Sequence, residues 1–136
     1  MSGYKFQDDL HFSIEPGRAV VANAGTIITS VIGIARRSQE TWVYVDAGIY
    51  QGLFEIFQSN GDIEYPVSVS SDSRNLVRYT IGGPTCDSSD VIATNIMLPQ
   101  LKIGDRIAFH QTGAYTTSVA TQFNGFDSPK TLYLND

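Results

Sequence analysis

The chain has 136 residues with a single cysteine, few lysines and no long hydrophobic run. The lone cysteine, Cys86, excludes an internal disulfide and a zinc site built from several cysteines. A single thiol also fits a reducing compartment. We therefore expect a cytoplasmic protein without a metal site.

The shortage of basic residues and of apolar runs excludes further classes. Nine Lys and Arg residues against fourteen Asp and Glu residues give a net charge of −5. This balance argues against nucleic acid and against an anionic membrane as partners. The longest apolar run, Thr26 to Ala35, is shorter than the ~20 residues of a membrane span. The first five residues lack the hydrophobic region of a signal peptide.

The residues that are abundant favour one domain rich in β-structure. Hydrophobic residues make up 42% of the sequence, and Val, Ile and Thr together supply 34 of the 136 residues. Twelve glycines and polar clusters such as residues 59–62 punctuate these segments as turns. The pattern predicts a mainly β fold, a mostly antiparallel barrel with short helices.

The expected elements are short. A helix is predicted over Ala19–Ala24, ended by Gly25, with single turns at Ser88–Val91 and Thr117–Thr121, and residues 68–73 are expected to form a loop. Strands are predicted at Leu10–Ile14, Thr26–Arg36, Trp42–Asp46, Leu76–Gly82, Arg106–Phe109 and Thr131–Leu134.

Two segments carry residue types suited to binding a ligand. In residues 15–18, Gly17 allows close backbone approach and Arg18 offers a forked donor for phosphate. The alternative is a turn with a surface ion pair. In residues 110–117, small residues flank Tyr115, whose hydroxyl can reach a ligand. The alternative there is a packed aromatic ring with its hydroxyl bonded to backbone.

Two further segments carry groups suited to chemistry. Residues 82–90 form a rigid polar turn that presents Cys86 beside Asp87. The alternative is that the thiol is a small buried hydrophobic group. Asp46 ends a strongly apolar strand, either as a cap for the next segment of the chain or as an acid of a site.

Taken together, six motifs resemble one family, the pyridoxal-phosphate-dependent decarboxylases of the ornithine/diaminopimelate/arginine type, in their C-terminal part. The resemblance runs from about Leu10 to Phe126. The motifs are EPGR at 15–18, VDAGIYQGL at 45–53, GGPTCDSSD at 82–90, LKIGDRI at 101–107, GAYTT at 113–117 and FNGF at 123–126.

The resemblance implies a fold and a domain organisation. Family members join an N-terminal TIM-type barrel, whose lysine forms a Schiff base with the cofactor, to a C-terminal β-barrel. Their active sites form between the two subunits of a head-to-tail homodimer. By this resemblance, residues 19–136 form a Greek-key-like antiparallel β-barrel similar to the C-terminal domain of alanine racemase. Residues 1–18, ending in the EPGR motif, are the remnant of the edge of the barrel that this chain lacks.

The resemblance also implies roles for individual residues, with pyridoxal 5'-phosphate as the cofactor of the intact enzyme. Glu15 faces the pyridine nitrogen and keeps the ring protonated, so that the ring can accept electrons. Arg18 and Tyr115 hold the phosphate, and Gly17 lets the backbone approach it. Cys86 is the catalytic proton donor after CO2 has left.

The substrate residues implied by the resemblance are acidic or aromatic. Asp87, which reaches the site from the partner subunit together with Cys86, pairs with the distal ammonium of the substrate. Asp46 falls where a second acid meets the same ammonium, and Phe123 lines the pocket. An Asp after the cysteine is similar to ornithine-type enzymes, whereas diaminopimelate-type enzymes tend to carry Glu. The expected substrate is therefore ornithine, with lysine as a further possibility.

The chain departs from the family in what it lacks. None of Lys5, Lys102 and Lys130 resembles the Schiff-base motif. We therefore expect a fragment, an isolated domain or one piece of a split gene, inactive by itself. Because the face toward the missing or separate TIM barrel would be bare, we expect self-association as a homodimer.

Two other hypotheses stay open. The first is a non-catalytic, decarboxylase-like regulator. The presence of the whole set of site residues argues against it. The second is a polyamine-binding module built on Asp46 and Asp87, which requires the pocket to survive without the barrel that walls it.

Overall fold

The computed structural model describes residues 11–38 and 40–134. In these two ranges it has six strands and five short helical segments. In chain order they are α1 (Arg18–Val21), η1 (Ala22–Ala24), β1 (Thr26–Arg37), β2 (Glu40–Val45), η2 (Ile49–Gln51), α2 (Phe54–Gln58), β3 (Val67–Val69), β4 (Leu76–Gly82), β5 (Val91–Pro99), β6 (Arg106–His110) and η3 (Phe123–Gly125).

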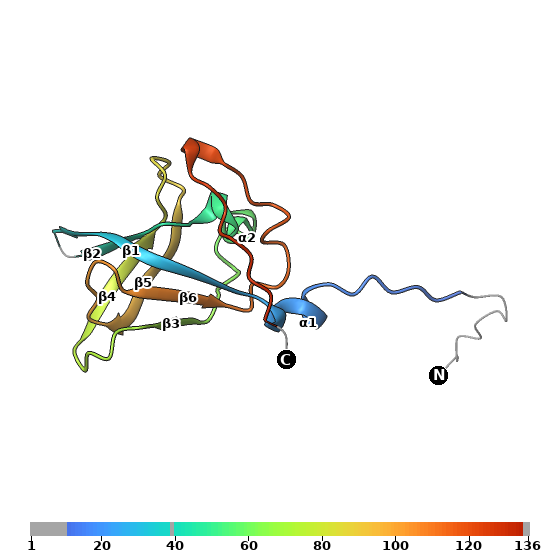
Figure 1. Ribbon diagram of the computed structural model, residues 1–136, viewed down its shortest axis with the longest axis horizontal. Helices are drawn as coiled ribbons and strands as arrows, with labels where there is room; N and C mark the ends of the chain where they lie inside the picture. Colours follow the sequence, from blue (N-terminus) through green and yellow to red (C-terminus); the bar gives the residue numbers. More distant parts are fainter. Residues whose placement is uncertain (1–10, 39, 135–136) are drawn as a thin grey trace, which may run out of the picture.

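The six strands form one sheet in the order β3-β6-β1-β2-β4-β5, which curls into a barrel (Figure 1). The prediction of a mainly β barrel with short helices is confirmed. Four of the five strand pairs are antiparallel, and β2 and β4 run parallel, with Val43 opposite Ile81. A parallel pair needs a crossover connection. Here the crossover runs through η2, α2 and β3.

The longest strand, β1, joins the two halves of the barrel. Its residues 26–30 pair with β6, and residues 31–37 pair with β2. The register shifts between Val31 and Gly33, which marks an irregularity where the strand passes from one partner to the other.

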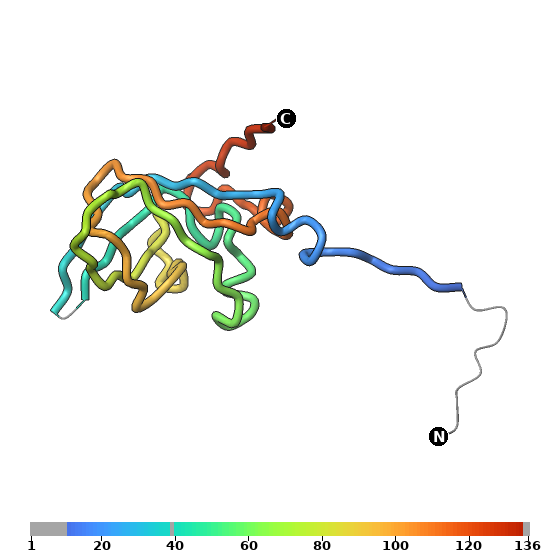
Figure 2. The backbone as a smooth tube through the Cα atoms, turned by 90° about the horizontal axis from the view of Figure 1, so that it is seen from below, coloured from blue at the N-terminus to red at the C-terminus, as the bar shows by residue number. Residues whose placement is uncertain are grey.

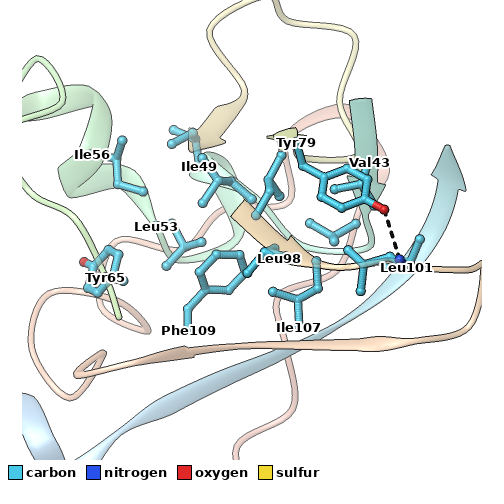
Figure 3. Packing of buried hydrophobic residues seen from close by; sticks show 14 residues of the cluster. Val43, Ile49, Leu53, Ile56, Tyr65, Tyr79, Leu98, Leu101, Ile107 and Phe109 are labelled. Atoms are coloured by element: carbon cyan, nitrogen blue, oxygen red, sulfur yellow. Dashed lines mark hydrogen bonds between the residues drawn. The ribbon is translucent and has the colours of Figure 1, made fainter. Parts of the chain in front are cut away.

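The interior of the barrel is a single apolar cluster (Figure 3). Val43, Val45, Ile81 and Ile107 are completely buried, as their β-branched shape suits a pleated surface. Tyr79 is also buried and satisfies its polar end by accepting a 2.9 Å hydrogen bond from the Leu101 amide. Such a core fixes the strand ends from which the functional loops leave.

Four of the predicted strands are present nearly as expected. They correspond to β1, β2, β4 and β6, and the bounds of β4 agree at both ends. The predicted helix over 19–24 is split into α1 and η1, and Gly25 follows it. Residues 88–89 and 117–119 form turns without a helix.

Two predicted strands are wrong. Residues 131–134 have no regular structure, and Leu132, Tyr133 and Leu134 are almost fully exposed, so their apolar alternation has no face to pack against. Of the strand predicted over 10–14, Leu10 lies outside the described residues, and His11–Ile14 form no strand.

Three elements differ from the sequence pattern. Residues 68 and 69, expected in a loop, belong to the short strand β3, which is held by β6. The strand β5 was not predicted. Asn95, which has a φ of 57°, interrupts its alternation of buried and exposed side chains. The helix α2 has only five residues and no side-chain cap.

The segment before α1 leaves the barrel. Figures 1 and 2 show it extending away from the sheet from residue 17 toward residue 11. The proposed division at residue 18 coincides with the start of α1 and stays a prediction. In the described part of the chain no helix has the length and apolarity to cross a bilayer.

Candidate active site

The N-terminal functional segment is held against the loop after β6 by two glycines. The Gly113 amide donates to the Ala22 carbonyl at 2.9 Å, and the Thr112 amide donates to the Gly25 carbonyl at 3.0 Å. A Cβ on Gly25 would stand only 2.7 Å from the Gly113 backbone, and a Cβ on Gly113 would collide with the Val21 carbonyl. Only glycine allows this crossing, which aligns α1 with the loop that carries Tyr115.

The same crossing brings Tyr115 to Gly17. A Cβ built on Gly17 would lie 3.0 Å from the Tyr115 hydroxyl, so the hydroxyl rests directly over the glycine backbone. Tyr115 has a left-handed φ of 53° and is 54% exposed. Its turn is closed by the Thr116 hydroxyl, which donates to the Thr112 carbonyl at 2.7 Å. A strained, exposed tyrosine does not match the packed-ring alternative.

Arg18, next to Gly17, is partly buried and paired. Its guanidinium forms an ion pair with Glu55 of α2 and lies over the Tyr65 ring, 5.9 Å from the centroid. The alternative of an ion pair in this segment is therefore present, with Glu55 as the acid. Glu15 is exposed in the segment that leaves the barrel.

These donors fit the phosphate of pyridoxal phosphate. The glycine at 17 leaves the space that a Cβ would fill beside the Tyr115 hydroxyl. A phenol hydroxyl and a guanidinium are donor types that bind a phosphate monoester, and Arg18 follows Gly17 in the chain. Of the residues selected from the sequence, the fold brings Gly17 and Tyr115 together, whereas the guanidinium of Arg18 lies against Glu55 and Tyr65.

A second cluster forms on the loop between β4 and β5. Asp90 is 3% exposed and fixes this loop to η2. Its carboxylate accepts hydrogen bonds from the Ile49 amide at 2.8 Å and from the Thr85 amide and hydroxyl at 3.0 and 2.7 Å. The carboxylate fills the space where Gly48 and Gly83 lack a side chain. The loop is therefore held rigidly while its tip stays open to solvent.

At that tip, Asp87 meets Tyr50 of η2. The Tyr50 hydroxyl donates a 2.5 Å hydrogen bond to Oδ2 of Asp87, and the Ser89 amide donates to Oδ1 at 2.8 Å. These two donors, Tyr50 first, hold the pKa of Asp87 below its ordinary 3.8. The same hydrogen bond raises the pKa of Tyr50 above 10.0. Asp87 is therefore a carboxylate at neutral pH, suited to a cation.

Cys86 and Phe123 join the same cluster. Cys86 is exposed, which does not match the alternative of a buried hydrophobic thiol. Its backbone amide and its Sγ both donate to Oδ1 of Asn124, each at 3.3 Å. The Phe123 ring packs on the Tyr50 ring with centroids 4.4 Å apart. Sequence reasoning missed Tyr50 and Asn124, although both lie inside motifs that it quoted.

Asp46 occupies a different environment. Its Oδ1 accepts a 2.7 Å hydrogen bond from the Ser30 amide, and its own amide donates to the Ser30 carbonyl at 3.1 Å. The carboxylate therefore holds the neighbouring strand β1 beside its register shift, which is not the cap for the following segment that the sequence suggested.

Comparison with known proteins places the chain in a family. Residues 18–113 match the pyridoxal-dependent decarboxylase C-terminal sheet domain. The lysine/ornithine decarboxylase of Selenomonas ruminantium is 38% identical over 122 residues, which are 90% of this chain and 30% of that protein. The chain belongs to the family of pyridoxal-dependent decarboxylases and corresponds to their C-terminal sheet domain.

Solved structures agree with this assignment. The lysine/ornithine decarboxylase from Vibrio vulnificus, complexed with cadaverine, matches with a TM-score of 0.81 and 43% identity, over 90% of this chain and 33% of that chain. The structure of SrLDC in complex with PLP and cadaverine matches with a TM-score of 0.74 and 39% identity, over 84% of this chain and 29% of that chain. The chain thus spans about a third of the length of its relatives.

Proposed function

We propose that the chain is the C-terminal domain of a decarboxylase of basic amino acids that acts on ornithine, and also on lysine, in cytoplasmic polyamine biosynthesis. It supplies half of an active site to a homodimer, and a TIM-type barrel supplies the other half. The observation that carries this proposal is the gathering of Cys86, Asp87 and Phe123 at one exposed loop tip.

Asp87 recognises the distal ammonium of the substrate. Its carboxylate is ionised at neutral pH and keeps a fixed orientation because Tyr50 and the Ser89 amide both donate to it. Phe123, whose ring packs at a tilt on Tyr50, covers the methylene chain of the substrate. Asp46 is proposed as a second acid for the same ammonium, in addition to its hydrogen bond with Ser30.

Cys86 delivers the proton that completes the reaction. Pyridoxal phosphate, when bound, supplies an electron sink for the pair left behind as CO2 departs. The Cys86 thiol then gives its proton to the α-carbon: the S–H bond breaks, a C–H bond forms, and the thiolate regains a proton from water. The exposure of Cys86 on its own domain suits delivery into a site on the partner subunit.

The cofactor contacts are assigned to the other cluster. Arg18 and the Tyr115 hydroxyl bind the phosphate above the Gly17 backbone, where the two segments already meet. Glu15 is proposed to pair with the protonated ring nitrogen of the cofactor once the segment before α1 lies against the TIM-type barrel.

The direct test is a chimera in which this chain replaces the matching domain of the Vibrio vulnificus lysine/ornithine decarboxylase. We expect CO2 release from ornithine and lysine. Cys86→Ala or Asp87→Ala should each lower kcat/KM at least about a hundredfold, because each removes a group at the reacting substrate. The neighbouring exposed Ser88→Ala is the matched control and should keep full activity.

Two outcomes would contradict the proposal. One is a folded, cofactor-loaded chimera that releases no CO2, or that keeps its activity without Cys86 and Asp87. The other concerns the isolated chain with pyridoxal phosphate, which should be inactive. Release of CO2 from ornithine by that chain would show that the barrel is not needed.

A further inference from the structure

We propose that Asn124 is the positioning residue that fixes the backbone and the sulfur of Cys86. This rests on the proposed function, in which Cys86 donates a proton. Oδ1 of Asn124 accepts from both the Cys86 amide and the Cys86 Sγ, each at 3.3 Å. An amide oxygen has two lone pairs and takes both donors at once. The residue therefore fixes the backbone and the sulfur of the same cysteine.

The backbone at Asn124 is arranged to make this contact. Its φ of 60° and ψ of 15° lie in the left-handed region, and Gly125 follows with a φ of 78°. Asparagine is one of the few side chains that adopt this conformation readily. Conformation alone would be met equally well by glycine, so the amide group and the backbone preference can be separated by mutation.

The segment that carries Asn124 is anchored to the same element that orients Asp87. The Thr121 amide donates to the Tyr50 carbonyl at 2.7 Å, and the Phe123 amide donates to the Thr121 hydroxyl at 3.3 Å. The Phe123 ring packs on Tyr50, whose hydroxyl holds Asp87. Residues 121–124 and η2 thus form one unit that sets the separation between the proton donor and the carboxylate. A shift of the segment would move the thiol relative to the substrate.

The test uses the full 136-residue chain, in which Cys86 is the only cysteine and alkylation reports on it alone. Asn124→Gly keeps the backbone conformation and removes the acceptor. The rate of iodoacetamide alkylation at neutral pH should rise about three- to tenfold, the equivalent of one lost hydrogen bond. Asn124→Asp keeps the shape but places a charge beside the sulfur. Alkylation should then slow about threefold, because only the thiolate reacts.

Asn60→Gly is the matched control. Asn60 also has a left-handed φ, 52°, and it follows α2, away from the contacts that hold Cys86. Cys86 in the Asn60→Gly variant should be alkylated at the same rate as in the unmodified chain. Equal rates for the chain and both Asn124 variants would overturn the proposal. Should Asn124→Gly fail to fold, the Asn124→Asp rate decides alone: a slower rate supports the proposal and an unchanged rate overturns it.

A second readout separates this inference from the proposed function. In the active chimera, Asn124→Gly should lower kcat about tenfold with little change in KM, because the proton donor is misplaced while Asp87 still holds the substrate. If the role of Asn124 were purely structural, the variant would lose stability without this selective fall in kcat. If the unmodified chimera is inactive, the proposed function fails, and the alkylation rates still decide whether Asn124 holds Cys86.

Discussion

The Tyr50 hydroxyl and the Asp87 carboxylate share a 2.5 Å hydrogen bond at the tip of the loop between β4 and β5. The two residues come from η2 and from the segment after β4, which the parallel pairing of β2 with β4 brings to the same end of the barrel. This bond sets the direction of the carboxylate that we assign to substrate recognition.

The first prediction concerns the pH dependence of that bond. Tyr50→Phe removes the main cause of the lowered pKa, so the pKa of Asp87 should rise toward 3.8. Because the folded pKa is lowered, the stabilisation is complete above 3.8 and is lost as pH falls through the folded pKa. The variant should therefore lose less stability upon acidification. Titration of the side-chain carboxyl by carbon NMR measures the pKa.

Tyr44→Phe is the control for this titration. The Tyr44 hydroxyl accepts a 2.8 Å hydrogen bond from Arg37, apart from the loop tip. Its removal should leave the titration of Asp87 unchanged. An Asp87 titration that is identical in the Tyr50→Phe variant and the unmodified chain would show that the hydrogen bond is absent in solution.

The second prediction concerns Asp90, which holds the loop in place. Asp90→Ala leaves the Ile49 and Thr85 amides without their acceptor in a buried setting. The free energy of unfolding should fall by about 2–4 kcal/mol. Urea denaturation measures it, and a loss below about 1 kcal/mol would contradict the anchoring role. The exposed Ser88→Ala in the same loop should change stability by less than about 0.5 kcal/mol.

The third prediction tests the phosphate cluster. Gly17→Ala places a Cβ 3.0 Å from the Tyr115 hydroxyl and should displace it. Pyridoxine 5'-phosphate, which lacks the reactive aldehyde, serves as the probe for the isolated chain. Its NMR titration should perturb the amides of residues 17, 18 and 115, and the perturbation should weaken in Gly17→Ala and in Tyr115→Phe.

The control for that variant is Gly33→Ala. Its Cβ would lie 3.6 Å from the Tyr44 ring, an ordinary contact. It should leave the titration as it is in the unmodified chain. Perturbations spread over the whole barrel, or equal in Gly17→Ala and Gly33→Ala, would contradict the assignment of this cluster to phosphate.

The fourth prediction separates the two roles of Asp46. Asp46→Ala should destabilise the chain by about 0.5–1.5 kcal/mol, because the Ser30 amide loses its acceptor. Asp46→Asn keeps an acceptor oxygen and should restore most of that stability. If Asp46 also meets the substrate, Asp46→Asn in the chimera should raise KM for ornithine. An unchanged KM would leave the hydrogen bond with Ser30 as the role of Asp46.

The sequence predicts those parts of the fold that depend on local pattern. The strands β1, β2, β4 and β6 carry enough β-branched and aromatic residues to be recognised without their neighbours. The strand β3 escapes prediction because its three residues are held only by pairing with β6, which is a tertiary effect. Residues 131–134 show the opposite failure, since a strand-like pattern forms no strand where the backbone pairs with no other strand.

In the candidate site, too, local residue pattern is predictable from the sequence and contacts between distant segments are not. Gly17 and Tyr115 are selected by residue type in two distant motifs, and the fold brings these two residues together. The contacts of Tyr50 with Asp87 and of Asn124 with Cys86 join distant segments. No local pattern reports such contacts, so these two supporting residues emerge only from the structure.

The central claim, that this domain donates half of a decarboxylase site to its partner subunit, is tested most directly by mixing two inactive chimeras. One lacks the Schiff-base lysine of its barrel and the other carries Cys86→Ala. If sites are shared between subunits, random re-pairing should restore about a quarter of the unmodified ornithine decarboxylation, since half of the dimers are mixed and each holds one intact site. Mixed dimers that form but release no CO2 from ornithine would contradict the claim.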